Sequence, residues 1–577
     1  MENRFVLGIW DGHDAGAALL CGDEIVFAIN EERLSRRKLE VGFPTRSIEA
    51  CLKAASLAPS EIGAVAASTT DPAKTLTRLV PSLKEEYYLL RRRKIPPRPF
   101  DSLRKVFKYR FTELHPNCLS RALSRSYLTR KLRDMGFAGF ALHLVDHHAA
   151  HAAAAAYCSG YPECLTAPLD GVGDGLSGSL WTLRDGSLTL LRALPASVSL
   201  GIFFEHVTNL MNMRELEDEG KVMALANYAY PVADGENPLL AIITAEGLDL
   251  KSPYSSTSMF REMKKILWRY PSEQFAFMAQ RALEKNALAL ITEALARTKL
   301  TKIAVAGGVF SNIKLNMSIA DLPQVERICV FPHMGDGGLA LGAAMSVNRS
   351  IRGVTAYKLN DLSLGPSFRR EEILQAIEQP LAAGGVRVVQ IENAPKEAAR
   401  LILDGEIILW FQGRMEIGPR ALGNRSILAR PDDRQIKDRL NRLLKKRVWY
   451  QPFCPSMLAE DAPFLLHMEG QEQKDNRFMT MAFRAREEKL PVMEGVINID
   501  GTCRPHFVGE ENLPFRELLR HIKKELGCGL VLNTSFNIHG DPMVCSPREA
   551  LETLGRTGIR YLFMGDILVE NVAPQSL

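Results

Sequence analysis

Two histidines one helical turn apart have a spacing suited to metal binding. His147 and His151 lie in an alanine-rich stretch, where a helix would project both imidazoles from one face. Asp146, directly before them, is the predicted N-cap of that helix. The H-x-x-x-H spacing is also typical of histidines that have only a structural role, so carboxylates elsewhere must support the metal interpretation.

Two aspartates flanked by glycines supply such carboxylates. Asp170 follows a predicted strand in Asp-Gly-Val-Gly-Asp-Gly, and Asp336 follows another in Gly-Asp-Gly-Gly. Gly171, Gly173 and Gly335 would let the backbone approach a phosphate, and each aspartate could hold a cation against it. Two imidazoles with two carboxylates suit iron, manganese or zinc, whereas an all-oxygen site suits magnesium. A simple turn is the alternative interpretation of each Asp-Gly pair.

A further glycine turn follows the predicted strand at 302–306. Gly307 and Gly308 precede Asn312 and a predicted helix. We expect this turn to contact the ribose or base of a nucleotide, although a lone Gly-Gly pair is a weak signal.

The last third of the chain places arginines among glycines. Arg420 and Arg425 lie in Gly-Pro-Arg-Ala-Leu-Gly-Asn-Arg-Ser, and Lys445 and Arg504 add positive charge. Guanidinium groups bind phosphate bidentately, so the segment predicts an anion site. Asn533 follows a predicted strand at 529–532 and offers an amide to a polar substrate group. A basic surface loop with structural asparagine turns is the alternative.

Apolar runs that alternate with turns indicate an α/β scaffold. Strands are predicted at 5–10, 15–20, 24–30, 141–145, 165–169, 302–306 and 329–332, and a helix at 339–345. The opening β-meander is typical of the actin-like, sugar-kinase-like ATPase fold. We predict an actin-like domain over 1–350 with a helical insertion at 84–135, followed by a second α/β domain over 360–577. The expected class is α/β and α+β.

Composition narrows the class of protein. The 577 residues are 46% hydrophobic and 24% charged, which is ordinary for a globular chain and argues against disorder. The sequence contains no apolar run of about 18 residues and no signal-peptide pattern, so we expect no membrane span. Ten cysteines without a C-x-x-C pair indicate reduced thiols and a cytoplasmic protein.

A basic segment interrupts the α/β pattern. Residues 91–134 contain 14 Lys/Arg and 3 Asp/Glu, interleaved with aromatic side chains. The pattern is typical of RNA-binding segments, but a solvated helical face or a lid over an acidic substrate also explains it. A nucleic-acid partner is therefore an alternative and not the main expectation.

Seven motifs occur in a fixed order along the chain. They are His13-Asp-Ala-Gly-Ala-Ala-Leu-Leu, Glu31-Glu-Arg-Leu-Ser-Arg, His147-His-Ala-Ala-His, Gly220-Lys-Val-Met-Ala-Leu-Ala, Ala306-Gly-Gly-Val, Gly413-Arg-Met-Glu-Ile-Gly-Pro-Arg-Ala-Leu-Gly-Asn-Arg-Ser and Leu532-Asn-Thr-Ser-Phe-Asn. Together they resemble the O-carbamoyltransferase family that decorates nodulation factors, aminoglycosides, cephamycins and ansamycins. The resemblance covers nearly the whole chain outside the basic insertion.

The resemblance implies two nucleotide-handling domains. The N-terminal domain is similar to the actin-like subunit that makes threonylcarbamoyl-adenosine in tRNA, and the C-terminal domain to the YrdC-like subunit of the same pathway. It implies an Fe(II)-type metal, with manganese or zinc as alternatives, that touches a nucleotide phosphate and is held by His147, His151, Asp170 and Asp336. Magnesium would accompany ATP.

In the second domain the resemblance implies a site for carbamoyl phosphate and the phosphates of ATP, formed by Arg420, Arg425, Lys445 and Arg504. Two departures affect this site. The family usually has Arg-Pro-Phe-Ala-Pro-Ser and Arg-Pro-Gln, whereas this chain has Gln451-Pro-Phe-Cys454-Pro-Ser and Arg-Pro-His506. One cationic anchor is missing, for which Arg447 is a candidate substitute.

The implied activity is ATP-dependent transfer of a carbamoyl group from carbamoyl phosphate, through carbamoyl adenylate, to a hydroxyl of a small-molecule acceptor. His13 is the predicted general base, with Asp11 and Asp14 to orient it or raise its pKa. Lys221 is a candidate contact for phosphate or acceptor. A homodimer is compatible with the sequence. The alternatives are carbamoylation of tRNA or of a protein thiol, and a non-catalytic ATP-binding regulator.

Overall fold

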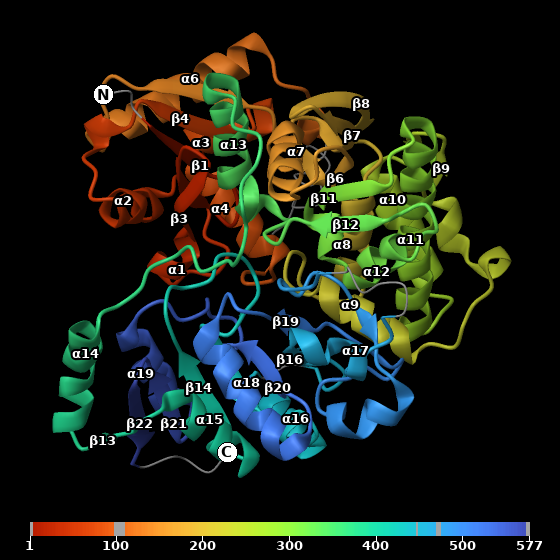
Figure 1. Ribbon diagram of the computed structural model, residues 1–577. Coiled ribbons are helices and arrows are strands. Elements are labelled where there is room, and N and C mark those ends of the chain that lie inside the picture. Colours follow the sequence, from red (N-terminus) through yellow and green to blue (C-terminus); the bar gives the residue numbers. More distant parts are fainter. Residues whose placement is uncertain (1–3, 97–109, 446–447, 469–474, 573–577) are drawn as a thin grey trace. The chain divides into compact units, whose positions relative to one another are not determined.

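The computed structural model describes residues 4–96, 110–445, 448–468 and 475–572 (Figure 1). The chain forms two compact units: an N-terminal unit of 1–31 and 39–358, and a C-terminal unit of 32–38 and 359–577. The short segment 32–38 belongs to the second unit because Arg33 donates from Nη2 to the carbonyl of Gly418 at 2.8 Å, and Arg36 from Nη1 to the carbonyl of Met543 at 2.7 Å. The sequence did not predict this discontinuity.

The N-terminal unit contains two five-stranded sheets with one topology. In each, the central strand pairs antiparallel with the nearer strand of a meander on one side and parallel with a later strand on the other, and a second parallel strand follows at the edge. This repeat of the α/β half confirms the predicted actin-like class, although the sequence shows no internal repeat. The strand order of the first sheet is β3 (Glu24–Asn30), β2 (Gly16–Cys21), β1 (Phe5–Trp10), β4 (Ala64–Ser68) and β5 (Ala141–Val145). The strand order of the second sheet is β8 (Ser187–Pro195), β7 (Leu176–Arg184), β6 (Cys164–Gly173), β11 (Lys302–Ala306) and β12 (Arg327–Val330).

Two helices pack against each other between these sheets (Figure 1). Helix α13 (Leu339–Arg352) contacts β1 and β4, and α7 (His147–Cys158) contacts β6 and β11. The helices approach so closely that a Cβ on Gly342 would lie 2.0 Å from the carbonyl oxygen of Ala150. The small residues of both helices therefore bring together the polar residues at their N-termini.

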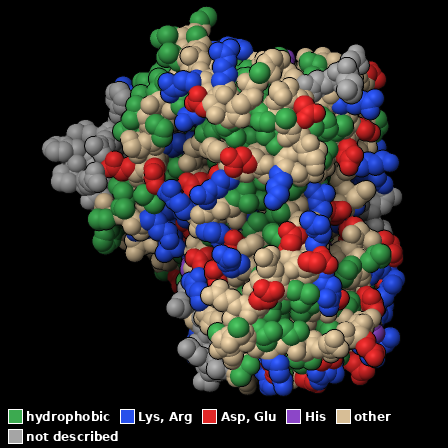
Figure 2. Space-filling model, turned by 90° about the vertical axis from the view of Figure 1, so that its left-hand side faces the viewer, with side chains coloured by type: hydrophobic (Ala, Val, Ile, Leu, Met, Phe, Trp, Pro, Cys, Tyr) green, Lys and Arg blue, Asp and Glu red, His purple; other side chains and the backbone are tan. Residues whose placement is uncertain are grey.

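The basic segment contributes helices to the N-terminal unit, and residues 97–109 of it lie outside the described residues. Helix α4 (Pro81–Arg91) follows α3 (Pro72–Leu79), and α6 (Cys118–Asp134) packs on α3. Arg91 pairs with Glu205 and Glu215, and Arg92 with Glu217 at 2.5 Å. Arg91 and Arg92 are buried, so the start of the basic segment is not a solvated face, whereas the arginines of α6 at 121, 125, 130 and 133 are exposed as that alternative expects. On the face shown in Figure 2, Lys and Arg side chains lie interspersed with Asp and Glu.

The C-terminal unit is built on a mixed eight-stranded sheet, as expected for a second α/β domain. Helices α15 (Ala394–Leu403) and α18 (Leu513–Leu526) cover it over a core that includes the fully buried Trp410. In sheet order the strands are β13 (Val386–Val389), β22 (Ile567–Asn571), β21 (Tyr561–Met564), β14 (Ile408–Phe411), β15 (Arg425–Ala429), β20 (Leu530–Ser535), β16 (Cys454–Leu458) and β19 (His506–Val508). No helix of the described residues in either unit has the length and apolar character needed to cross a membrane.

Candidate functional site

The two histidines and two aspartates meet in the N-terminal unit. His147 and His151 project from α7, Asp170 from β6, and Asp336 from the turn before α13, and all four are buried. One ligand atom from each lies within 4.8 Å of the others. Nε2 of His147 is 3.3 Å from Oδ2 of Asp170, and Nε2 of His151 is 3.7 Å from Oδ1 of Asp336. Thr69, which the sequence analysis missed, lies 2.9 Å from Nδ1 of His147 through its hydroxyl and so orients Nε2 towards the cluster.

The chemistry of this cluster fits a divalent metal ion. Nε2 of His151 is buried and lacks a hydrogen-bond partner among the described residues, which leaves a nitrogen lone pair available. Burial, followed by the charge of Asp170, raises the pKa of Asp336 to about 8, and a bound cation would favour its ionised form. Burial alone would raise the pKa of Asp170, but its hydrogen bond to His147 and the charge of His151 hold it well below the usual value. The choice among iron, manganese and zinc stays a prediction.

Asp174 holds the surrounding backbone, a role that the sequence analysis did not assign. Its Oδ1 accepts hydrogen bonds from the N–H groups of Thr70 at 2.8 Å and Asp71 at 3.0 Å, and its Oδ2 from that of His147 at 2.7 Å. Asp146 occupies the predicted N-cap position of α7, but its side chain makes no capping hydrogen bond. Its exposed side chain instead pairs with Arg121 at 2.7 Å, and the carboxylate of Asp174 accepts from the first N–H of the helix. The second aspartate of Asp-Gly-Val-Gly-Asp was the available signal.

The glycines after Asp170 differ from their predicted setting. Strand β6 continues to Gly173, with a register shift after Leu169, so Asp170 lies within an irregular strand end instead of following the strand. A Cβ on Gly173 would lie 2.2 Å from the ring of His147, so the close packing of this ring requires a glycine at position 173. A Cβ on Gly171 would only reach ordinary contact with Glu205, at 3.4 Å.

The second glycine turn supports the cluster directly. The N–H of Gly308 donates to Oδ1 of Asp170 at 2.7 Å, and the N–H of Gly307 to the carbonyl of Met334 at 2.7 Å. Asn312 caps the following helix, α12 (Ile313–Ala320), through its side-chain oxygen. These groups therefore have structural partners. Near Gly335, in contrast, a Cβ would meet open space.

His13 lies beside the cluster, but its neighbours differ from the prediction. Its Nδ1 is 3.1 Å from the hydroxyl of Tyr88 on α4 and 3.4 Å from Oδ2 of Asp336. Trp10 donates from Nε1 to the carbonyl of His13 at 2.7 Å. Burial, and next the charge of Arg91, lowers the pKa of His13 to about 3, so the expectation of a raised pKa is wrong. A neutral imidazole at this position can accept a proton.

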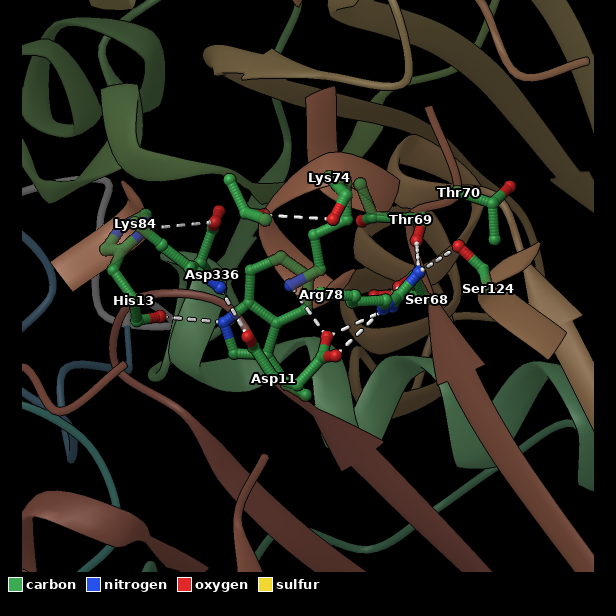
Figure 3. A network of polar contacts seen from close by, with 12 residues as sticks. Asp11, His13, Ser68, Thr69, Thr70, Lys74, Arg78, Lys84, Ser124 and Asp336 are labelled. Atoms are coloured by element: carbon green, nitrogen blue, oxygen red, sulfur yellow. Dashed lines mark hydrogen bonds and ion pairs between the residues drawn. The ribbon is translucent and has the colours of Figure 1, made fainter. Parts of the chain in front are cut away.

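Asp11 faces three cations (Figure 3). Its carboxylate lies 2.6 Å from Nζ of Lys74 and accepts from Nε of Arg78 at 2.8 Å, while Lys84 donates to its carbonyl. Burial alone would raise the pKa of Asp11, but Arg78 and Lys74 together lower it overall. These contacts anchor α3 and α4 beside His13, a role different from the predicted orientation of His13.

Lys221, at the start of α9 (Glu219–Leu225), pairs with Asp218 at 2.7 Å. Within the described residues, no contact places it in the four-ligand cluster. Its predicted contact with phosphate or acceptor stays a prediction.

Two of the predicted donor-site arginines, Arg420 and Arg504, lie close enough in the C-terminal unit for their charges to interact. Arg504 donates to Sγ of Cys454 from Nη2 at 2.9 Å and from Nε at 3.2 Å. Nε of Arg420 is buried and lacks a partner among the described residues, and burial, then the charge of Arg504, lowers the pKa of Arg420 to about 9. Among the described contacts, neither guanidinium pairs with a carboxylate. Two like charges without a counter-charge fit a site for an anion.

The other two predicted cations support backbone near this pair. Arg425 is fully buried, stacks over Phe411, and donates from Nη1 to the carbonyl of Gln412 at 2.5 Å. Lys445 donates to the carbonyls of Ser535 at 2.6 Å and Asn537 at 2.9 Å. Both cations are therefore bound to carbonyl oxygens, which gives them a structural role, and their contact with phosphate stays a prediction.

Asn533 lies within β20 instead of after it. Its Nδ2 donates to the hydroxyl of Ser456 at 2.8 Å, whereas its buried Oδ1 has no partner among the described residues. His506 is also buried against Ser456, and burial lowers its pKa to about 3, so it does not replace a cation. Oε1 of Gln451 is a further buried atom without a partner in the described part of the chain. The proposed substitute Arg447 lies outside the described residues.

Comparison with known proteins gives two family matches and a set of relatives. Residues 6–345 match the family model described as Carbamoyltransferase N-terminus, and residues 399–571 match Carbamoyltransferase C-terminus. The uncharacterized protein MJ1051 of Methanocaldococcus jannaschii is 30% identical over 98% of this chain and 100% of its own length. Nodulation protein NolNO of Sinorhizobium fredii is 30% identical over 97% and 79%, and a 3'-hydroxymethylcephem-O-carbamoyltransferase of Streptomyces clavuligerus is 28% identical over 70% and 78%.

Proposed function

Because the chain belongs to the carbamoyltransferase family, we propose that it moves a carbamoyl group from carbamoyl phosphate, through carbamoyl adenylate, to a hydroxyl of a small-molecule acceptor, with consumption of ATP. The observation that carries this proposal is that each unit has its own charged site. The N-terminal unit holds four buried metal-type ligands beside His13, and the C-terminal unit holds two arginines for which the described residues provide no carboxylate partner.

Donor activation belongs to the C-terminal unit in this proposal. Arg420 and Arg504 bind the phosphate of carbamoyl phosphate and neutralise its charge. The free Oδ1 of Asn533 accepts a hydrogen bond from the carbamoyl NH2, which distinguishes this group from a simple acyl group. Water releases phosphate from carbamoyl phosphate, the carbamate formed attacks the α-phosphate of ATP, and pyrophosphate leaves. The product, carbamoyl adenylate, is a mixed anhydride that keeps the carbonyl activated and gives the protein a larger group to hold.

Transfer to the acceptor belongs to the N-terminal unit. When the imidazole of His13 carries its hydrogen on Nδ1, towards Tyr88 and Asp336, its Nε2 is left to accept the proton of the acceptor hydroxyl. A metal ion held by the four ligands would neutralise phosphate charge as AMP leaves. Burial of His13 keeps the base neutral before the reaction.

The name of one relative supports a hydroxyl acceptor, since that relative is named as an O-carbamoyltransferase of a hydroxymethylcephem. The internal ion pairs of α4 remove part of the support for an RNA acceptor, because Arg91 and Arg92 already have carboxylate partners. Membership of an enzyme family likewise disfavours the regulator hypothesis.

A half-reaction assay tests the proposal without knowledge of the acceptor. Protein loaded anaerobically with Fe(II) is incubated with ATP and carbamoyl phosphate, and AMP and pyrophosphate are quantified by chromatography. We expect pyrophosphate and AMP that both depend on carbamoyl phosphate. Arg420→Ala should lose both products, whereas Asp336→Ala should still form pyrophosphate and release less AMP. Asp146→Asn is the matched control, because Asp146 is an exposed aspartate beside the cluster. Absence of AMP from folded, metal-loaded protein would refute the proposed route.

A further inference from the structure

Cys454 lies directly in the arginine pair of the C-terminal unit. It is 8% exposed, at the start of β16, and its sulfur receives two hydrogen bonds from the guanidinium of Arg504. Across the antiparallel pair of β16 and β20 it stands opposite Asn533, so both side chains lie on one face of the sheet. The sulfur thus occupies a position where cationic donors and a polar side chain converge.

Two independent observations indicate that this position receives a ligand. Nε of Arg420 and Oδ1 of Asn533 are both buried and lack partners among the described residues, although buried polar atoms are almost always paired. Asn533 is only 2% exposed, so bulk water does not satisfy its oxygen. One free donor and one free acceptor next to a thiol describe a built polar site and not an isolated cysteine.

The same contacts favour chemistry at the sulfur. The reactive form of cysteine is the anion, and Arg504 presents two hydrogen-bond donors and a positive charge to the sulfur of Cys454. Cys503 provides the contrast within the same region. It is 1% exposed, and burial, followed by the charge of Cys454, raises its pKa, which disfavours its anion.

We propose that Cys454 is a modification site for small hydroperoxides, which react with its sulfur when the arginine pair holds no anion and thereby block the donor site. This inference rests on the proposed function, because it takes the arginine pair as the donor site. The sulfur anion attacks one oxygen of hydrogen peroxide, an S–O bond forms, and the O–O bond breaks. Hydroxide leaves and is protonated to water, so that peroxide is reduced while sulfur is oxidised by two electrons to a sulfenic acid.

The modification changes both the charge and the size of the group between the guanidinium groups. An added oxygen fills space that a phosphate oxygen would use, and it competes for the hydrogen bonds of Arg504. A thiol reductant restores the original group, because sulfenic acids are reduced through a disulfide. Donor binding would therefore be lost under oxidation and recovered on reduction.

The test quantifies sulfenic acid at each cysteine in the full chain. Protein is treated with hydrogen peroxide in the presence of dimedone, which traps sulfenic acids, and labelling is measured by peptide mass spectrometry with and without inorganic phosphate. We expect Cys454, which is 8% exposed, to be labelled faster than Cys503 at 1% and Cys528 at 2%, and saturating phosphate to slow its labelling. Arg504→Met should slow labelling about tenfold, the loss expected for a charged hydrogen-bond donor, and Arg504→Lys should restore part of it.

A second measurement follows activity. Peroxide should abolish carbamoyl phosphate-dependent AMP formation in the wild type, and dithiothreitol should restore it. In Cys454→Ala, the same peroxide treatment should leave the activity equal to that of the untreated variant. Labelling of Cys454 no faster than that of Cys503, or labelling that phosphate does not change, overturns the inference even where AMP is formed. Phosphate-protected labelling in protein that forms no AMP supports the inference and refutes only the adenylate route.

Discussion

The carboxylate of Asp174 should control metal affinity without touching the metal ligands' coordinating atoms. It accepts three backbone hydrogen bonds, one of them from the N–H of His147, the first residue of α7. In Asp174→Asn, the amide oxygen can replace Oδ1, which serves Thr70 and Asp71, but the NH2 group then faces the N–H of His147. One buried donor is left unsatisfied and the remaining bonds lose their charge, which together costs about 2–4 kcal/mol in the free energy of unfolding.

The same substitution should weaken metal binding about 10- to 100-fold, the usual effect of removing a group that orients a ligand. Isothermal titration of the apoprotein with Mn(II) measures this affinity, and thermal unfolding of the apoprotein measures the stability term separately. Asp146→Asn is the matched control, since it removes an exposed ion pair worth about 0–1 kcal/mol one residue before His147. Equal metal affinities for wild type and Asp174→Asn, or equal losses in both variants, would refute the reasoning.

Three further outcomes follow from the charged clusters. Asp11→Asn should lower the free energy of unfolding by about 3–5 kcal/mol at pH 7, because Arg78 and Lys74 lose their buried partner. The folded pKa of Asp11 lies below its unfolded value of about 3.9, so the stability difference between wild type and variant should persist down to about pH 4 and shrink at lower pH. Urea denaturation that shows a larger stability difference in acid would contradict this. Arg420→Met should raise the KM for carbamoyl phosphate about 10- to 100-fold with little change in Tm. Arg425→Met should instead lower the Tm, because each buried carbonyl left without its hydrogen-bond donor costs about 1–3 kcal/mol. Steady-state kinetics and calorimetry distinguish the two effects, and the reverse pattern counts against the assignment. Removal of the metal ion by a chelator should lower the Tm by several degrees, because a ligand present at a hundred times its Kd contributes about 2.7 kcal/mol to the free energy of unfolding. An unchanged Tm after verified metal removal argues against a metal in the cluster.

The arrangement of the N-terminal unit explains how distant residues form one cluster. Helices α7 and α13 each follow a parallel strand and pack together between two sheets of equal topology. Their N-termini therefore converge with the end of β6, which is the switch point where open α/β sheets bind ligands. His147, Asp170 and Asp336 come from separate elements and meet for this reason.

The sequence by itself determined the features that depend on local spacing. Alternation of apolar runs and turns is a property of a few adjacent residues, so the opening meander and the strand at 302–306 could be predicted. The i, i+4 spacing of His147 and His151 likewise follows from helix geometry alone. Family membership was recoverable because several short motifs keep their order along the chain.

Only the tertiary structure decided which groups satisfy one another. Tyr88 reaches His13 from 75 residues away, and Asp174 caps a helix that begins 27 residues before it. Asp11 looked suited to orient His13 because the two are close in sequence, but Lys74 and Arg78 of α3 bind its carboxylate, and α4 binds its backbone carbonyl. A buried charge is stabilised by the partners that folding brings within hydrogen-bond distance, and these partners bear no relation to sequence spacing.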